Sequence, residues 1–157
     1  LSGVDKALMF TNDNQNIKQW NLARDNAISS FHKFLKHQPQ FINYDEVLIK
    51  WIKAMPLQHD EQESEKNIKF LLEVLQNQSE KVLGQNNSNL PKVLRILCKV
   101  YDTKFASESD METIKVVIKN IFLNENYQGL VKTSIGEANS ELQEKMKELY
   151  KCFTSNN

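Results

Sequence analysis

The chain has 157 residues, a length that suits one compact domain or a short stack of repeats. Its 20 Lys and Arg residues balance 20 Asp and Glu residues, so the formal net charge is zero. This balance excludes a strong overall field for nucleic acid or an anionic membrane, although it is compatible with a local charged patch. The chain holds only 4 Gly and 3 Pro, which disfavours a sheet protein rich in turns and favours helices with short connections.

The cysteines and the apolar runs narrow the class of protein further. Cys98 and Cys152 are too few for a disulfide framework, so we expect free thiols in a reducing compartment. No apolar run approaches the roughly 18 residues of a membrane span, and no secretory signal precedes the first helix. The chain begins with Leu1 rather than Met, and we expect it to be a piece of a longer protein.

The first predicted elements are the end of one helix and the whole of another. Residues 3–10 have the composition of the second half of a helix, and residues 11–16 form a polar turn. Apolar residues at spacings of three and four then predict a long helix over residues 17–37. Pro39 ends this helix, because the residue before a proline avoids the helical region.

Two more helices are predicted in the middle of the chain. The first covers residues 44–55, with Asn43 as its N-cap and Pro56 as its stop. The second covers residues 60–77 and opens on an acidic run, which the helix dipole favours at that end. Gly84 then suits the end of a helical segment.

The C-terminal part predicts three further helices. One begins after Asn89, its predicted cap, and carries Pro91 in its first turn, where a missing N–H is harmless. The next covers residues 109–123. Residues 129–136 form a short piece with little pattern, and the last helix is predicted over residues 137–153.

The long helices begin near residues 17, 60 and 109, a period of about forty-odd residues that is typical of HEAT-type helical hairpins. The predicted fold is therefore all-α, a right-handed HEAT-repeat solenoid of about three hairpins, although a plain helical bundle would give a similar pattern. We expect the first ten residues to expose apolar surface that a missing repeat once covered. The predicted array is a single domain over residues 1–157, divided into the tail of a truncated hairpin (1–10), two hairpins (14–56 and 60–103), and a C-terminal hairpin with its cap (107–153).

Three strings in order carry a resemblance to a known family. Residues 24–30 read RDNAISS, residues 47–51 read VLIKW and are followed by MPL ahead of the acidic run, and residues 82–92 read VLGQNNSNLPK. These strings are similar to ENAISA, VLPHWLSWLPL and VLGPNNTNLPK of the importin-β (karyopherin-β) superfamily, importin-5 type. The resemblance covers about residues 24–96. Where the family has a second Trp this chain has Ala54, and Ile49 and Gln85 replace Pro.

The resemblance implies the last few HEAT repeats, at the C-terminal end of a nuclear transport receptor. Such receptors carry protein cargo through nuclear pores by weak contacts with phenylalanine-glycine nucleoporins, and the GTPase Ran controls loading and release. They shuttle between cytoplasm and nucleus. The main Ran-binding surface lies toward the other end of the receptor, and Ran hydrolyses the GTP. The resemblance therefore implies a binding protein rather than an enzyme.

The chain shows no motif for enzymatic chemistry, so we expect no catalytic residue, cofactor or metal. Glycine-rich phosphate loops and the strained serine turn of hydrolases are both missing. His32 and His37 are five residues apart, which does not place them on one helical face as a zinc pair requires, and we expect both to be solvated. His59 belongs to a solvated helix start, and Cys98 is expected to be an inert core residue.

One set of basic residues is a candidate binding surface. Lys92, Arg95 and Lys99 occur at positions i, i+3 and i+7 of one predicted helix, and Lys50 and Lys53 share a face of another. In a HEAT stack the second helix of each hairpin lines the concave surface. These five residues are therefore candidates for a basic ladder that faces an acidic surface of a partner protein. The alternative is an ordinary solvated face.

Other classes of function compete with a transport receptor. A HEAT scaffold outside transport, such as a platform for a phosphatase or kinase complex, would share the predicted fold. A small helical enzyme would need a convergent polar pocket, for which the sequence offers no residues. A nucleic-acid-binding module is disfavoured by the zero net charge and by the presence of only two arginines, Arg24 and Arg95.

Overall fold

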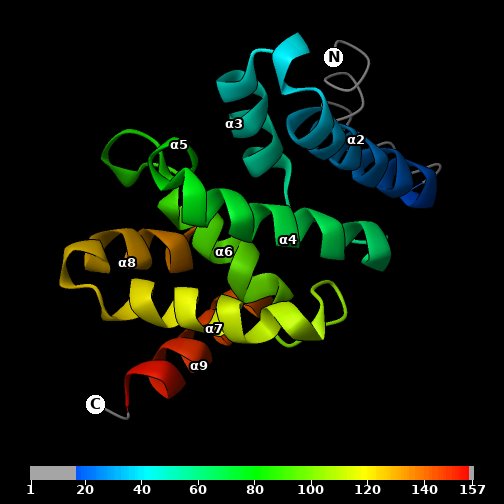
Figure 1. Cartoon of the computed structure of the whole chain (residues 1–157). Helices are drawn as coiled ribbons and strands as arrows, with labels where there is room; N and C mark the ends of the chain where they lie inside the picture. The colour runs from blue at the N-terminus through cyan, green and yellow to red at the C-terminus, as the bar shows by residue number, and fades with distance from the viewer. Residues whose placement is uncertain (1–16, 156–157) are drawn as a thin grey trace.

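The computed structural model describes residues 17–155, and over these residues it contains helices and connecting turns but no strand (Figure 1). The predicted all-α class is therefore confirmed for this part of the chain. The helix end predicted over residues 3–10, the turn over residues 11–16 and the expected apolar surface of residues 1–10 lie outside the described residues.

The first hairpin begins and ends close to where the sequence predicts. Helix α2 spans Ile17–His37, a 3-10 turn η1 spans Pro39–Phe41, and α3 spans Tyr44–Ala54. Asn43 caps α3, because its side-chain oxygen accepts the N–H of Glu46 at 3.4 Å. The apolar stripe of α2 is buried only in its second half, whereas Ile17 at its start is 59% exposed.

The second long helix, α4, spans Glu61–Asn77 and is capped by Asp60, whose carboxylate accepts the N–H of Glu63 at 2.9 Å. A short helix, α5 (Ser79–Leu83), follows it and ends at Gly84, where the sequence predicts the end of a helical segment. Gly84 ends α5 with φ +73°, a left-handed value that glycine adopts without strain. In the next 3-10 turn, η2 (Gln85–Asn87), two asparagines also take left-handed values.

Helix α6 spans Leu90–Val100 and carries Pro91 in its first turn, as predicted. The predicted side-chain cap at Asn89 is wrong. Asn89 has a helical backbone, unlike a capping residue, and makes no cap hydrogen bond; its side-chain amide donates to the carbonyl of Val82 at 3.1 Å. Asn89 therefore ties α6 back to α5.

The C-terminal part contains three helices, namely α7 (Glu108–Leu123), α8 (Gln128–Gly136) and α9 (Ser140–Thr154), with a 3-10 turn η3 (Glu125–Tyr127) after α7. The predicted last helix over residues 137–153 begins too early, because Asn139 caps α9 by accepting the N–H of Leu142 at 2.9 Å. The piece over residues 129–136 is helical despite its weak pattern. It packs on α6, where the Ser134 hydroxyl donates to the Pro91 carbonyl at 2.7 Å.

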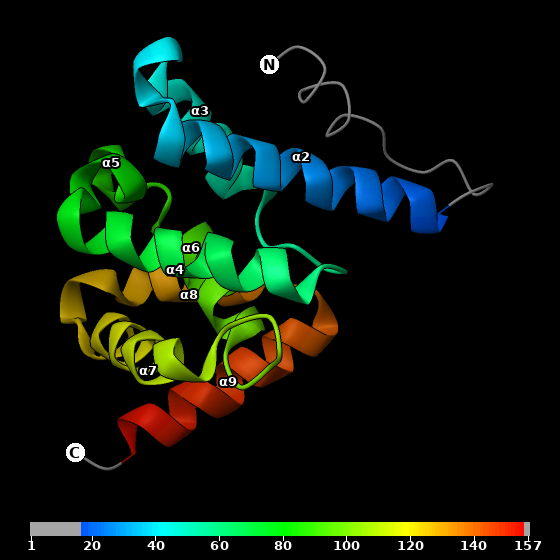
Figure 2. The same ribbon diagram turned by 45° about the vertical axis from the view of Figure 1, so that its right-hand side comes forward.

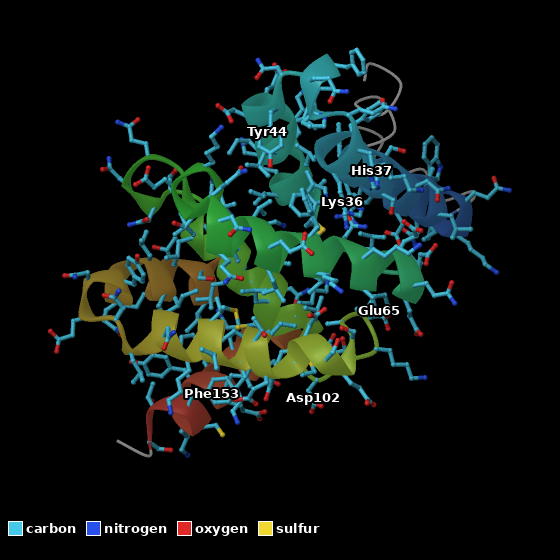
Figure 3. The ribbon with its side chains drawn as sticks, in the orientation of Figure 1. Lys36, His37, Tyr44, Glu65, Asp102 and Phe153 are labelled. Atoms are coloured by element: carbon cyan, nitrogen blue, oxygen red, sulfur yellow. The ribbon has the colours of Figure 1, made fainter. Side chains whose placement is uncertain are left out.

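The helices pack in two layers. In the first layer α2 contacts α4 and α4 contacts α7, and Figure 2 shows these three helices one above another. In the second layer α3 contacts α6, and α6 contacts α8 and α9. One apolar core runs through both layers. Figure 3 shows its extent, with Tyr44 on α3 at one end of the molecule and Phe153 on α9 at the other.

Candidate protein-binding surface

Helix α6 lies inside the structure, since it packs against α3, α7, α8 and α9. Each of its eleven residues is buried except Lys92, Arg95 and Lys99. These three residues recur at helical spacing and therefore form one strip, which we call the basic strip. The only part of α6 that solvent reaches is thus positively charged.

Arg24 joins the basic strip from α2, and sequence reasoning missed it. Its Nη2 donates to the Ala54 carbonyl at 2.6 Å and its Nη1 donates to the Pro56 carbonyl at 3.4 Å, so the guanidinium sits at the end of α3. The charge of Arg24 acts on both Lys92 and Lys99. No local pattern relates Arg24 to residues so far along the chain, and the packing of α2, α3 and α6 brings them together.

Arg95 is the member of the strip that has an acidic partner. Its Nη1 lies 2.8 Å from Oε2 of Glu137, and the same nitrogen donates to the Ser134 carbonyl at 3.5 Å. Arg95 therefore anchors the end of α8 to α6, and its charge is largely satisfied within the chain.

Lys92 has no such partner. Its side chain is partly buried and makes no hydrogen bond or ion pair with any described residue. Burial and, to a smaller extent, the nearby cations Arg95, Arg24 and Lys99 together lower the pKa of Lys92 to about 8. Lys99 is exposed; partial desolvation and Arg24 lower its pKa, whereas Glu141 on α9 acts in the opposite direction.

The two candidate lysines on α3 have different surroundings. Lys50 pairs with Glu46 at 3.3 Å, one turn earlier on the same helix, and Lys53 is exposed in the last turn. Neither is among the charges that act on Lys92 or Lys99. The structure therefore groups the three α6 residues with Arg24 rather than with the α3 pair.

Two hollows flank the helices of the strip. One of about 490 Å³ lies beside Lys99, between the turn after α3, the end of α6 and the start of α9. Lys145 borders it but is engaged, since its Nζ donates to the carbonyls of Lys99 at 3.2 Å and Tyr101 at 2.5 Å. The other, of about 690 Å³, lies between α4 and α7.

The expectation that His32 is solvated is wrong. The His32 ring is only 4% exposed and lies 5.1 Å from the Phe70 ring and 6.4 Å from the Trp51 ring, measured between centroids. Burial lowers its pKa to about 4, and both ring nitrogens are without a hydrogen-bond partner among the described residues. The reason is that α3 and α4 cover this face of α2, which the sequence of α2 alone does not reveal.

Two polar side chains near His32 join three helices. The Trp51 indole N–H donates to Oδ1 of Asn67 at 2.8 Å, and the Asn67 amide donates to the carbonyl of Glu63 at 2.7 Å. The Asn67 amide also reaches the Ser29 hydroxyl at 3.4 Å. Trp51 itself is fully buried.

The remaining residues from the sequence analysis are Cys98, His59 and Cys152. Cys98 is buried in the core, as predicted, and burial raises the pKa of its thiol to about 12. His59 is exposed at the start of α4, as expected, while Cys152 is exposed near the end of α9. Within residues 17–155 no three His, Cys, Asp or Glu side chains gather as metal ligands would.

Two further findings concern membrane-spanning helices and known protein families. Among the helices that the structure describes, none combines the length and the apolar composition needed to cross a membrane. A scan of the chain against models of known protein families finds no match.

Proposed function

We propose that this chain is the C-terminal HEAT-repeat segment of a nuclear transport receptor, acting through protein binding. The observation that carries the proposal is the order of the three strings that resemble the importin-β superfamily, together with what each string does in the fold. Each one supplies the contacts at a joint between helices.

The first string holds the turn between α3 and α4. Arg24 donates to two carbonyls at the end of α3, and the Asp25 carboxylate accepts the backbone N–H groups of Gln58, His59 and Asp60 at 2.7–3.2 Å. Asp25 is 1% exposed, so these bonds are made out of water, where charge-assisted bonds are strong.

The second and third strings act in the same way. Trp51, in the second string, is the buried side chain of α3 that bonds to Asn67 of α4. The third string contains Gly84 and the two left-handed asparagines Asn86 and Asn87, which reverse the chain between α5 and α6. Resembling strings that all lie at helix joints support a common architecture more strongly than matching surface residues would.

The packing of neighbours also supports stacked hairpins. The contacts of α2 with α4 and of α4 with α7 follow chain order in one layer, as do those of α3 with α6 and of α6 with α9 in the other. In a solenoid each repeat contacts its neighbours, so small changes at each interface add up to a change of curvature. A receptor of this kind works as a flexible spring around its cargo.

In this proposal the partners are cargo proteins, nucleoporins and Ran, with Ran bound mainly by other parts of a longer receptor. The protein acts by binding in the cytoplasm and nucleus, and the GTP is hydrolysed by Ran. The basic strip with Arg24 is the part of this segment that faces an acidic partner surface.

The test uses the full-length protein that contains this segment. Immobilised protein is exposed to Ran loaded with a non-hydrolysable GTP analogue and, separately, to Ran loaded with GDP. We expect binding to Ran-GTP to be at least about 100-fold tighter, a coupling of about 3 kcal/mol. Equal binding of both forms would contradict the transport function and favour a HEAT scaffold outside transport.

A charge-reversal variant then tests whether this segment contributes to binding of an acidic partner. Lys92 and Lys99 are changed to Glu, while Arg95 is kept because its ion pair with Glu137 anchors α8. We expect Ran-GTP selectivity to survive and binding of an acidic partner to be lost. Loss of Ran selectivity in this variant would contradict the assignment of Ran binding to other parts of the receptor.

A further inference from the structure

The residues of the basic strip are the only residues of α6 that are not buried. Eight of the eleven residues of α6 are buried, and the three that are not are Lys92, Arg95 and Lys99. A solvated helix face normally carries both signs of charge, as α9 does with its alternating Glu and Lys residues. The strip carries one sign only, and Arg24 adds a fourth cation from another helix.

The acidic groups of residues 17–155 do not neutralise this cluster completely. Glu137 pairs with Arg95, and Glu141 acts on Lys99. Asp25 acts on Arg24, although its carboxylate is already bonded to three backbone N–H groups. Lys92 is left with three N–H donors and no acceptor among the described residues.

This arrangement costs folding free energy. Like charges at helical spacing repel each other, and a partly buried ammonium loses hydration without gaining a hydrogen bond. A bound anion would remove both costs at once, since it would supply the missing acceptor and offset the repulsion. Sites that are unfavourable in the free protein and favourable with a ligand are characteristic of binding surfaces.

We propose that Lys92, with Lys99 two turns further along α6, is a carboxylate-binding site that anchors an acidic segment of a protein partner. The inference deepens the proposed function and rests on it, since it names the chemistry of the partner that the basic strip receives. Lys92 makes the central contact and Lys99 extends the site along α6.

The geometry favours an acidic protein segment over nucleic acid. Lys92 and Lys99 are seven residues apart on α6, so their Cα atoms are about 10 Å apart, a distance that two nearby carboxylates of an extended peptide span. Both arginines of the chain are already engaged, one by carbonyls and one by Glu137. Nucleic-acid surfaces need many phosphate contacts, and a chain of zero net charge with two free lysines here offers few.

The test measures binding of a labelled short peptide with Glu at alternate positions, by fluorescence anisotropy at low salt. The control peptide carries Gln at the same positions. We expect the Glu peptide to bind the 157-residue chain at least about tenfold more tightly than the Gln peptide, because one buried charge pair is worth more than 1.4 kcal/mol. Added salt should weaken the binding.

Matched variants then locate the site. We expect Lys92→Met to weaken binding of the Glu peptide about tenfold or more, and Lys92→Arg to keep it within about threefold. The control Lys115→Met removes one charge from a partly buried lysine on α7 and should leave binding unchanged. Lys92→Met should also keep or raise the melting temperature, since it removes a partly buried cation, so lost binding would not reflect unfolding.

Equal binding by Lys92→Met and Lys115→Met would overturn the inference, as would tighter binding of a single-stranded RNA of similar length than of the Glu peptide. These outcomes are distinct from failure of the proposed function. A receptor that selects Ran-GTP but binds Glu and Gln peptides equally overturns only the carboxylate site. A chain that binds the Glu peptide through Lys92 but whose full-length parent ignores the nucleotide on Ran overturns only the transport function.

Discussion

His32 and Lys92 are two side chains whose surroundings disfavour their charged forms, with different consequences. His32 lies in the core against Trp51 and Phe70, where a neutral imidazole behaves as an aromatic packing group. Lys92 keeps its charge at neutral pH, because its pKa of about 8 is still above 7. His32 is therefore a packing residue that destabilises the fold when it is protonated, and Lys92 is a charge available to a partner.

The stability of the protein should fall in mild acid because of His32. The pKa of His32 is about 4 in the folded chain, against about 6.5 when unfolded, so between these values the unfolded state binds the extra proton. The stabilising contribution is complete above about pH 6.5 and is lost as the pH falls toward 4. From about pH 7.5 to pH 5 the loss is about 2 kcal/mol.

The variant His32→Phe isolates this effect in urea unfolding at the two pH values. Phe fills the same aromatic site and cannot titrate, so its stability should fall by about 2 kcal/mol less than that of the parent chain. His59→Phe is the matched control, since His59 is exposed before α4 and is not among the groups that act on His32. Its replacement should leave the pH dependence unchanged. Identical pH dependence in the His32 variant would contradict the buried neutral imidazole.

At the scale of the elements, the connections between helices carry the buried polar contacts. The turn from α3 to α4 has no regular hydrogen bonds of its own, and Asp25 of α2 satisfies three of its backbone N–H groups. Ser64 of α4 similarly donates to the Phe105 carbonyl at 2.7 Å, in the connection before α7. Helices α2 and α4 thus each bind a turn that connects other helices.

Removing the Asp25 carboxylate should therefore be strongly destabilising. We expect Asp25→Ala to lower the free energy of unfolding by about 3–5 kcal/mol, because it removes the buried carboxylate that accepts three backbone N–H groups of the turn. Asp25→Asn keeps one oxygen and should cost less, about 1–3 kcal/mol. Circular dichroism during urea unfolding measures both.

The control is Asp102→Asn, in the connection after α6 that Figure 3 labels. Asp102 is exposed and has φ +57°, a value that Asn also tolerates, so this change should stay within about 0.5 kcal/mol. An Asp25→Ala variant as stable as this control would show that water satisfies the turn and that the three hydrogen bonds contribute little.

At the scale of the whole molecule, the main contacts of the described residues join helices that lie next to one another in the two layers. Helix α9 contacts α6, α7 and α8, while α2 contacts α3 and α4. The core is continuous, yet its two ends share few direct contacts. Such an arrangement allows one end to loosen while the other stays folded.

A substitution that creates a cavity at the C-terminal end tests this arrangement. Met146 of α9 is fully buried, so Met146→Ala should cost about 2–5 kcal/mol. Amide hydrogen exchange should then speed up in α6 to α9 and change little in α2 and α3, whereas Lys147→Ala, exposed on the same helix, should change neither. Equal acceleration in all helices would mean that the molecule opens as one cooperative unit.

The positions of the helices follow from local sequence signals. Apolar spacing, Pro39, Pro56 and Gly84 determine where α2, α3 and α5 end, because periodicity and capping act within a few residues of the chain. The basic strip is also visible in the sequence, since three charges at helical spacing must share a face. The short helix α8 and the break before α9 depend instead on packing against α6, which overrides a weak local pattern.

Burial and the grouping of distant residues were decided by the tertiary structure. His32 and Arg24 both lie on α2, yet His32 is covered by α3 and α4 while Arg24 reaches the end of α3 and acts on Lys92. Nothing in the sequence of a single helix states which neighbour will cover which face. Local hydrogen bonds and periodicity therefore determine the elements from sequence alone, whereas desolvation and charge proximity depend on contacts between segments that only the folded chain brings together.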